Sequence, residues 1–220
     1  MKKYVFGDLH GSLYALDKLL RLVDEHAAGE PHKKIFLGDY VDRGAFSCQV
    51  IERLMNLRGD CVFLKGNHED MMIESFKEFE RTGEHNVMWL VNGGMTTLMS
   101  YPNHQVGDDQ WKWLNDLKLS YEDDLRYYVH AGINPLTTLA NQTSNSQLWI
   151  RKGFIDCGFP FEKYIVHGHS VESTTNPVIL HNRANMDTGG VFEGTFTVGV
   201  FDDSQEKPID IIQYKNPTTH

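Results

Sequence analysis

The stretch GDYVDRG, residues 38–44, places two acidic side chains and one basic side chain directly after the apolar run Ile35–Leu37. Turns favour Gly and Asp for backbone reasons alone, so this stretch taken by itself is compatible with a simple turn. Four other apolar runs end in the same way, in polar residues beside glycine: GDLHG at 7–11, GNHE at 66–69, HAG at 130–132 and HGH at 167–169. This repetition favours a functional interpretation over a turn.

The composition is typical of a globular protein. With 220 residues, of which 40% are hydrophobic and 23% charged, the chain can bury a core without disulfides, and we expect one domain over residues 1–220. The formal net charge is -9 and no basic run is present, which argues against nucleic-acid binding. No apolar stretch is long enough to span a membrane, so no membrane partner is expected.

The cellular compartment is predicted from the N-terminus and the cysteines. The apolar run that follows the two N-terminal lysines is too short for the core of a signal peptide. Cys48, Cys61 and Cys157 are odd in number and widely spaced, which is typical of reduced thiols. A cytoplasmic location is therefore expected.

Strands and helices alternate in the first part of the chain. Strands are predicted at 3–6, 34–37 and 61–64, and helices at 12–28, 46–57 and 69–80. Such alternation favours parallel strand pairing with helices covering the sheet. Further helices are predicted at 87–99, interrupted by two glycines, and at 109–117, and short strands at 127–129, 164–166, 177–180, 195–201 and 209–214. The polar segment 137–146 is predicted to be an exposed loop.

The five polar clusters all follow predicted strands. Ligands of open α/β sheets bind at the C-terminal ends of the strands, so the clusters should converge on one crevice. Asp, His and Asn offer oxygen and nitrogen donors, which suit Mn, Fe or Zn better than a thiolate site would. Seven such donors fit two ions that share a carboxylate. Two ions so bridged lie about 3.5–4 Å apart and can clamp the attacking and leaving oxygens of an in-line displacement.

The motifs GDLHG, GDYVDRG, GNHE, HAG and HGHS, in this order, resemble the metallophosphoesterase superfamily. The DRG of GDYVDRG is similar to the phosphoprotein phosphatase branch, and the chain most resembles its short bacterial and bacteriophage serine/threonine phosphatases. LWIRKGF at 148–154 and NMDTGG at 185–190 also look like segments of that group. The resemblance implies an α/β fold, an αββα sandwich of two mixed sheets with helices outside and a dimetal site at one edge.

The resemblance also implies roles for individual residues. Six side chains are implied as ligands of two divalent ions, with Mn favoured and Fe or Zn as alternatives: Asp8, His10 and Asp39 for the first ion, and Asp39, Asn67, His130 and His169 for the second. Arg43 and Arg151 would hold the phosphoryl oxygens. His68 would be the general acid, and Asp42 would fix its tautomer and raise its pKa. His167 is expected to be structural.

These roles imply hydrolysis of phosphomonoesters, and they favour a serine/threonine protein phosphatase. A water held by two dications loses its proton near neutral pH and can attack phosphorus in line. Guanidinium forks match the equatorial phosphoryl oxygens, and an imidazolium can protonate the leaving alkoxide. The expected substrate is a phosphorylated protein or a small phosphoester.

Three alternatives remain at this point. A symmetrical diadenosine tetraphosphate hydrolase would share the scaffold, but that branch is implied to carry Gln where this chain has His10. An inactive phosphoprotein-binding module would be expected to lack a ligand or the general acid. A metal-storage protein would not need the arginines. For Trp89, Trp111 and Trp113, both a cover near the cleft and ordinary helical core are compatible with the sequence.

Overall fold

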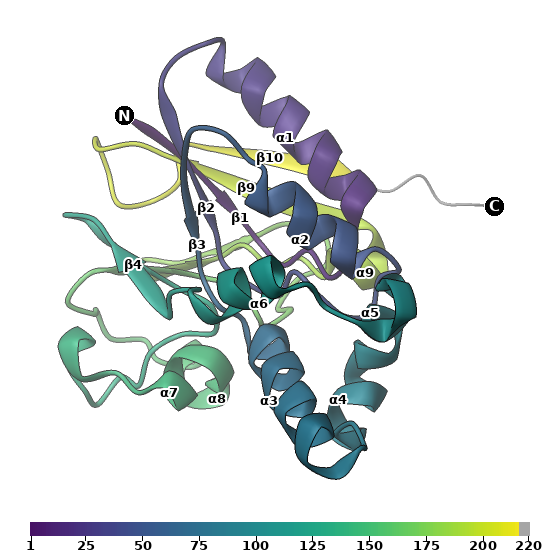
Figure 1. Cartoon of the computed structure of the whole chain (residues 1–220). Coiled ribbons are helices and arrows are strands. Elements are labelled where there is room, and N and C mark those ends of the chain that lie inside the picture. Colours follow the sequence, from purple (N-terminus) through teal and green to yellow (C-terminus); the bar gives the residue numbers. More distant parts are fainter. Residues whose placement is uncertain (216–220) are drawn as a thin grey trace.

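The fold is known from a computed structural model that describes residues 1–215, so the last five residues of the predicted domain lie outside the described part. Two five-stranded sheets stack face to face, with strand order β10-β9-β1-β2-β3 in the first and β4-β5-β6-β8-β7 in the second (Figure 1). Parallel and antiparallel pairs occur in both. The predicted pair of mixed sheets is confirmed.

The elements have the following bounds. The first sheet comprises β1 (Lys2–Phe6), β2 (His32–Phe36), β3 (Asp60–Phe63), β9 (Thr195–Phe201) and β10 (Asp210–Lys215), and the second comprises β4 (Ser120–Glu122), β5 (Arg126–Val129), β6 (Tyr164–His167), β7 (Val178–Ile179) and β8 (Arg183–Asn185). The α-helices are α1 (Leu13–Ala27), α2 (Ser47–Met55), α3 (Asn67–Thr82), α4 (Val87–Trp89), α5 (Met95–Ser100), α6 (Asp108–Asn115), α7 (Ser144–Trp149), α8 (Lys152–Ile155) and α9 (Gly190–Glu193). A π-helical turn spans Leu90–Gly94, and short 3-10 helices span Pro102–His104 and Leu139–Asn141.

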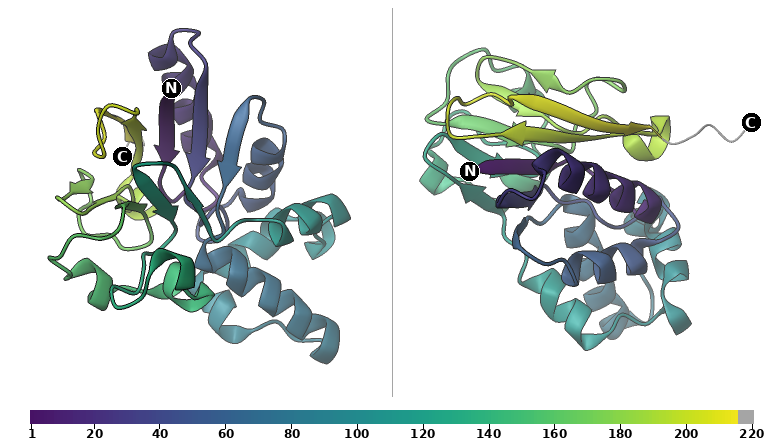
Figure 2. Two further views of the ribbon diagram at one scale, coloured as in Figure 1. Left: turned by 90° about the vertical axis from the view of Figure 1, so that its left-hand side faces the viewer. Right: turned by 90° about the horizontal axis from the view of Figure 1, so that it is seen from above.

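Successive side chains of each strand point to opposite faces, so one strand can contribute to two layers of the core. On β1, Tyr4 and Phe6 pack in the layer beneath α1 and α2, whereas Val5 packs between the two sheets. On β5, Tyr128 belongs to the layer between the sheets, and Val129 packs on the outer face beneath α8. Helices therefore cover the outer face of each sheet, as Figures 1 and 2 show.

The parallel strands bring their C-terminal ends to one edge of the sandwich. In the first sheet β2 pairs in parallel with both β1 and β3, with Phe6 opposite Phe36 and Phe36 opposite Phe63. These three rings stack at centroid distances of 4.3 and 5.2 Å. In the second sheet β6 pairs in parallel with β5 and β8. Each of the five predicted polar clusters follows one of these strands.

The predicted helix 87–99 exists but is bent. It is divided into α4, the π-helical turn and α5, with the kink at Gly93, whose φ is 112°. α4 projects from the sandwich beside α3 (Figure 2), whereas α5 packs against α2. Trp111 packs edge-on against Phe76, and Trp113 packs against Tyr40, so these two tryptophans belong to the core rather than to a cover.

Part of the loop prediction for 137–146 was wrong. Residues 139–141 form a short 3-10 helix, and Ser144 begins α7, where the side chain of Thr143 accepts a hydrogen bond from the backbone N–H of Ser146. A capping Thr followed by Ser, Asn and Ser looks like loop composition, although the same residues start a helix well. Within residues 1–215, no helix has the length and apolar character needed to cross a bilayer.

Candidate active site

The strand ends bring two groups of possible metal ligands together at the edge of the sandwich. His10, Asp39 and His68 form one group, and Asp39, His130 and His169 form the other. Within each group the potential ligand atoms all lie within 4.8 Å of one another, and all five residues are buried. His10, Asp39 and His68 follow β1, β2 and β3 of the first sheet, and His130 and His169 follow β5 and β6 of the second. The predicted convergence is therefore present.

Asp39 lies between the two groups. Its Oδ2 is 3.5 Å from His10 Nε2, and its Oδ1 is 3.4 Å from His130 Nε2. The backbone N–H of His68 donates to Oδ1 at 3.0 Å and fixes the orientation of the carboxylate. Each oxygen of Asp39 thus faces a different histidine, which is the position that a bridging carboxylate requires.

The imidazoles are oriented by the main chain. Nδ1 of His10 lies 2.9 Å from the carbonyl of Val41, and Nδ1 of His130 lies 2.9 Å from the carbonyl of Leu37. A hydrogen bond from Nδ1–H to a carbonyl leaves Nε2 with a lone pair, which is the usual second-shell arrangement of a metal-ligating histidine. The buried Nε2 of His169 has no hydrogen-bond partner among the described residues, and Asn67 Oδ1 lies 2.9 Å from His130 Nε2.

The electrostatics of the site fit bound cations. Burial raises the pKa of Asp39 to about 7, and it lowers the pKa of His10, His130 and His169, the last to about 3. The histidines are then neutral near pH 7, which is the form that can ligate a metal. Buried carboxylates without cationic partners are costly, and divalent ions would compensate them. The donor set thus fits the two ions that the sequence implies.

Asp8 lies beside the loop that carries His169. It belongs to neither group of three; instead, its carboxylate oxygens accept from the backbone N–H of His169, each at 3.3 Å. It also lies beside Asp187. Burial, reinforced by the negative charges of Asp187 and Asp39, raises the pKa of Asp8 well above its ordinary range. The grouping of Asp8 with His10 around one ion stays a prediction.

His68 and Asp42 form the predicted dyad. His68 Nδ1 donates to Asp42 Oδ2 at 2.7 Å, and both side chains are buried. Two further donors hold the same carboxylate: Trp89 Nε1–H lies 3.0 Å from Oδ2, and the Thr97 hydroxyl lies 2.7 Å from Oδ1. Trp89 is thus both a buried core residue and part of the site. The bent helix 87–100 thereby touches the site through these two side chains.

The pKa of His68 differs from the expectation. Burial lowers it below 6.5, against the upward pull of the Asp39 carboxylate, and the guanidiniums of Arg43 and Arg151 lower it further. Burial also raises the pKa of Asp42 to about 7, in spite of the hydrogen bonds from Thr97 and Trp89. In the protein alone the net shift of the His68 pKa is downward, opposite to the predicted direction.

The two arginines lie at opposite ends of the site. Arg43 is half-buried; its Nη1 contacts His10 Nε2, its Nη2 lies 3.0 Å from His68 Nε2, and its guanidinium lies 5.1 Å from the ring centroid of Phe192. Arg151 is exposed, and its Nη1 donates at 3.2 Å to the carbonyl of His169 and at 3.2 Å to the Ser170 hydroxyl. Both guanidiniums therefore border the cluster of ligands.

The backbone is strained where the candidate residues lie. Eight non-glycine residues in the described chain have positive φ, and five of them are candidates: His10, Asp39, Asp42, Arg43 and His169, with φ of 45, 52, 71, 68 and 66°. Such conformations cost about 1–3 kcal/mol each and persist only where the surroundings enforce them. At Gly66 a Cβ would lie 2.1 Å from Asp39 Oδ1, so only glycine permits this approach.

Several residues of the site escaped the sequence analysis. Glu69 is buried and accepts hydrogen bonds from the backbone N–H groups of Gly66, Asp39, Tyr40 and Val41. It therefore links the segment that follows β2 to the start of α3. The missed signal was an acidic residue at the third position of a helix that begins at a strand end. Asp187 follows β8 in the same manner as the recognised clusters, but β8 is only three residues long.

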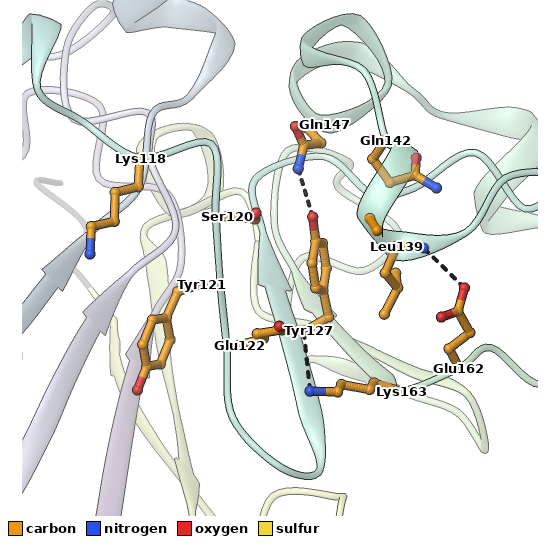
Figure 3. A pocket seen from close by; sticks show the side chains of 11 residues that line it. Lys118, Ser120, Tyr121, Glu122, Tyr127, Leu139, Gln142, Gln147, Glu162 and Lys163 are labelled. Carbon is orange, nitrogen blue, oxygen red and sulfur yellow. Dashed lines mark hydrogen bonds and ion pairs between the residues drawn. The ribbon is translucent and has the colours of Figure 1, made fainter.

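A separate pocket of about 750 Å³ lies between β4, β5 and the segment 139–147 (Figure 3). Its polar side chains are paired with one another: Gln147 Nε2 donates to the Tyr127 hydroxyl at 2.7 Å, and Lys163 Nζ lies 3.1 Å from Glu122 Oε2. None of the ligand groups described above lines it. This pocket is therefore not the candidate site.

Comparisons with known proteins all point to phosphoesterases. The sequence model of calcineurin-like phosphoesterases matches residues 1–173. Serine/threonine-protein phosphatase 2B catalytic subunit A1 of Saccharomyces cerevisiae is 32% identical over 138 residues, which are 60% of this chain and 21% of that protein. A symmetrical bis(5'-nucleosyl)-tetraphosphatase of Pseudomonas putida is 30% identical over 141 residues, covering 63% of this chain and 45% of that protein. The chain thus spans less than half of either relative.

A third relative matches over most of its length. The asymmetrical bis(5'-nucleosyl)-tetraphosphatase PrpE of Bacillus thuringiensis is 27% identical over 233 residues, covering 90% of this chain and 89% of that protein. Among solved structures, a putative diadenosine tetraphosphatase superposes with a TM-score of 0.73 at 18% identity, covering 99% of this chain and 94% of that one. A cold-active protein tyrosine phosphatase superposes with a TM-score of 0.65 at 18% identity, covering 96% and 75%.

Proposed function

The chain belongs to the calcineurin-like phosphoesterase family, and on this premise we propose that it is a dimetal-dependent phosphomonoester hydrolase acting on phosphoserine and phosphothreonine residues of proteins. The observation that carries the proposal is the position of His68, whose Nδ1 lies 2.7 Å from Asp42 and whose Nε2 lies 3.9 Å from the Asp39 carboxylate. The alkoxide of Ser or Thr needs a proton as the P–O bond breaks, and His68 is placed to deliver it.

The assignment of the metal ligands follows from the donors at the strand ends. His10 and Asp39 would hold one ion together with Asp8, and Asp39, Asn67, His130 and His169 would hold the other. Bound divalent ions, Mn²⁺ in our proposal, lower the pKa of a coordinated water and neutralise phosphoryl charge. The Nδ1–carbonyl contacts of His10 and His130 support this assignment, because they turn Nε2 into the site.

Arg43 and Arg151 bind the phosphoryl group in this proposal. A guanidinium offers two parallel N–H donors that match two phosphoryl oxygens, and the two side chains approach the site from different elements. They would hold the phosphorus in line between the attacking oxygen and the leaving oxygen. Together with the bound ions they would also make the local potential at the site positive in spite of the overall charge of -9, because the local potential governs binding.

His68 acquires its proton in the presence of substrate. The two guanidiniums lower the pKa of His68 in the protein alone. A phosphomonoester dianion that pairs with both of them cancels this contribution, and the pKa of His68 rises towards its ordinary range. Asp42 holds Nδ1 and leaves Nε2 directed at the leaving oxygen.

A second candidate is hydrolysis of dinucleoside tetraphosphates. The observation that favours it is the extent of the match to the Bacillus relative named for that activity, which covers 90% of this chain. The leaving group of that reaction is a phosphate, which is stable as an anion and needs little protonation. The two activities should therefore differ in how much they depend on His68.

The experiment compares the two substrates in one protein. The protein is stripped with a chelator and assayed with and without Mn²⁺ on a phosphothreonine peptide and on diadenosine tetraphosphate, with His68→Asn as the variant. Peptide turnover that requires Mn²⁺ and collapses in the variant supports the protein phosphatase. Rapid tetraphosphate cleavage with little peptide turnover assigns the enzyme to nucleotides instead. Bound Mn²⁺ without turnover of either substrate refutes both activities.

We also propose a cytoplasmic location. Cys48, Cys61 and Cys157 form no disulfide in the part of the chain that the structure describes. Burial raises the pKa of the Cys48 thiol, which keeps it protonated and unreactive. Three thiols without a disulfide among the described residues suit a reducing compartment. Fractionation of cells that express a tagged chain tests the location.

A further inference from the structure

We propose that Arg183 is a positioning residue that fixes two segments relative to each other. One is the loop that carries His169, and the other is α8, which directly follows Arg151. The inference rests on the proposed function, because it concerns a metal ligand and a phosphate-binding arginine of that site. Arg183 lies on β8 and only 1% of its surface is exposed. It contacts neither group of ligands directly and acts through the segments on each side of it.

The first segment is residues 168–172, which follow β6. Arg183 forms a two-pronged ion pair with Glu172, with Nη1–Oε1 and Nη2–Oε2 distances of 2.6 Å each. Asn185, two residues further along β8, donates to Glu172 Oε1 at 2.9 Å and to the carbonyl of Ser170 at 2.5 Å. β8 therefore binds this loop at two residues, Glu172 and Ser170, and Ser170 is the residue next to His169.

These contacts matter because the backbone conformation of the loop is not one that its residues prefer by themselves. His169 has φ of 66°, a left-handed conformation that is costly for a residue with a Cβ. The backbone N–H groups of Gly168 and Ser170 bond to the carbonyls of His130 and Gly168 at 2.8 and 2.7 Å. Those two bonds set the turn, whereas Glu172 and Arg183 anchor its far end. Without the anchor, the turn keeps only these bonds and the backbone contacts of His169 with Asp8 and Arg151, and His169 can shift relative to Asp39.

The second segment is α8. Nη2 of Arg183 donates to the carbonyl of Ile155 at 3.2 Å, and the guanidinium lies 5.8 Å from the ring centroid of Phe154. α8 begins directly after Arg151, whose carbonyl accepts from the N–H groups of Phe154 and Ile155. Arg151 in turn reaches back to the carbonyl of His169. Arg183 thus connects the segment that carries the phosphate-binding arginine, Arg151, to the loop that carries the metal-binding His169.

Only arginine can make this set of contacts. Its planar fork pairs with both Glu172 oxygens while Nη2 also reaches the carbonyl of Ile155, and an ammonium cannot reproduce that geometry. Second-shell groups that orient a metal ligand change metal affinity by about 10- to 100-fold when they are altered. The expected phenotype of Arg183→Lys is therefore weaker metal binding in a folded protein.

The chain offers a matched control in Arg126. It also lies in the second sheet, on β5, it is completely buried, it pairs with an aspartate, Asp123, and it lies 5.0 Å from the ring centroid of Phe201. Its remaining contacts are carbonyls of residues 202–206, far from the site in the fold. Arg126→Lys should therefore cost similar stability without touching the loop at 168–172.

The experiment titrates Mn²⁺ into chelator-stripped wild type, Arg183→Lys and Arg126→Lys by isothermal titration calorimetry, with urea unfolding of each. We expect Arg183→Lys to weaken Mn²⁺ binding by about 10- to 100-fold, and Arg126→Lys to bind like wild type. Excess Mn²⁺ should restore most of the turnover of Arg183→Lys and leave a raised KM. If Arg183→Lys does not fold, Glu172→Gln, which keeps the side-chain volume, takes its place with the same expectation.

The outcomes separate this inference from the proposed function. Wild type that binds no Mn²⁺ refutes the dimetal proposal itself. Wild type that binds Mn²⁺ together with an Arg183→Lys variant of equal affinity refutes only the positioning role. Equal weakening in Arg183→Lys and Arg126→Lys also refutes it, because the loss would then reflect general loosening of the second sheet.

Discussion

Replacing Trp89 by Phe should separate substrates by their leaving group. The change removes the indole N–H, which lies 3.0 and 3.2 Å from the two oxygens of Asp42, and keeps an aromatic ring in the core. That hydrogen bond lowers the pKa of Asp42, which burial has raised to about 7. In the variant the pKa of Asp42 rises further, and a neutral carboxyl no longer supports the imidazolium of His68.

The size of the effect follows from the type of hydrogen bond. A hydrogen bond to a charged group contributes about 1.5–3 kcal/mol. At about 1.4 kcal/mol per factor of ten, this corresponds to a rate loss of about 10- to 150-fold. Thr97 still donates to Asp42 at 2.7 Å and His68 still lies 2.7 Å away, so we expect the lower end, about 10-fold.

The assay measures kcat on a phosphothreonine peptide and on p-nitrophenyl phosphate with saturating Mn²⁺. The peptide rate should fall by about 10-fold, whereas nitrophenolate leaves without protonation and its rate should change little. Trp113→Phe is the control, because Trp113 is half-buried and packs against Tyr40 and Phe63. Equal losses on both substrates, or the same loss in the control, would refute the role of the indole.

Three further predictions concern stability and substrate binding. Mn²⁺ at 100 times its Kd should stabilise the stripped protein by about 2.7 kcal/mol, or about 5–10 °C in Tm by scanning fluorimetry, and no shift would contradict a native metal site. Burial raises the pKa of Glu172, but hydrogen bonds from Arg183 and Asn185 outweigh burial and leave this pKa below 4.5. The ionised Glu172 therefore stabilises the fold fully above pH 4.5, and the difference in urea stability between wild type and Glu172→Gln should close as the pH falls below that value. A difference that is independent of pH would contradict the assignment. Arg151→Lys should raise KM for the peptide by about 10-fold through loss of the fork, and an unchanged KM would remove Arg151 from the phosphate site.

The sequence predicted the parts of the site that lie at strand ends. Alternating strands and helices place GDLHG, GDYVDRG and GNHE at one sheet edge, and this rule needs no knowledge of side-chain packing. The position of Asp8 was beyond it. Which residues meet the Asp8 carboxylate depends on how the two sheets stack, which a strand pattern does not specify.

Contacts between distant segments were also beyond the sequence. The donors to Asp42 come from Trp89 and Thr97, which lie 47 and 55 residues away in the chain. No periodicity relates them to Asp42, and their contact depends on the kink at Gly93. The very short strands β4 and β8, at three residues each, carry too few positions for alternation to show. Arg183 therefore lay on a strand that the sequence did not reveal.

The strand order of the first sheet has a consequence during synthesis on the ribosome. β1 lies between β2 and β9, and Lys3 pairs with Phe201, so its second neighbour is translated after the whole of the other sheet. Until then β1 presents unpaired N–H and C=O groups along one side, which is the kind of edge that recruits other chains. A nascent chain that stalls before residue 195 is therefore exposed to aggregation even though β1, β2 and β3 have all emerged, and chaperones that shield such edges would protect it.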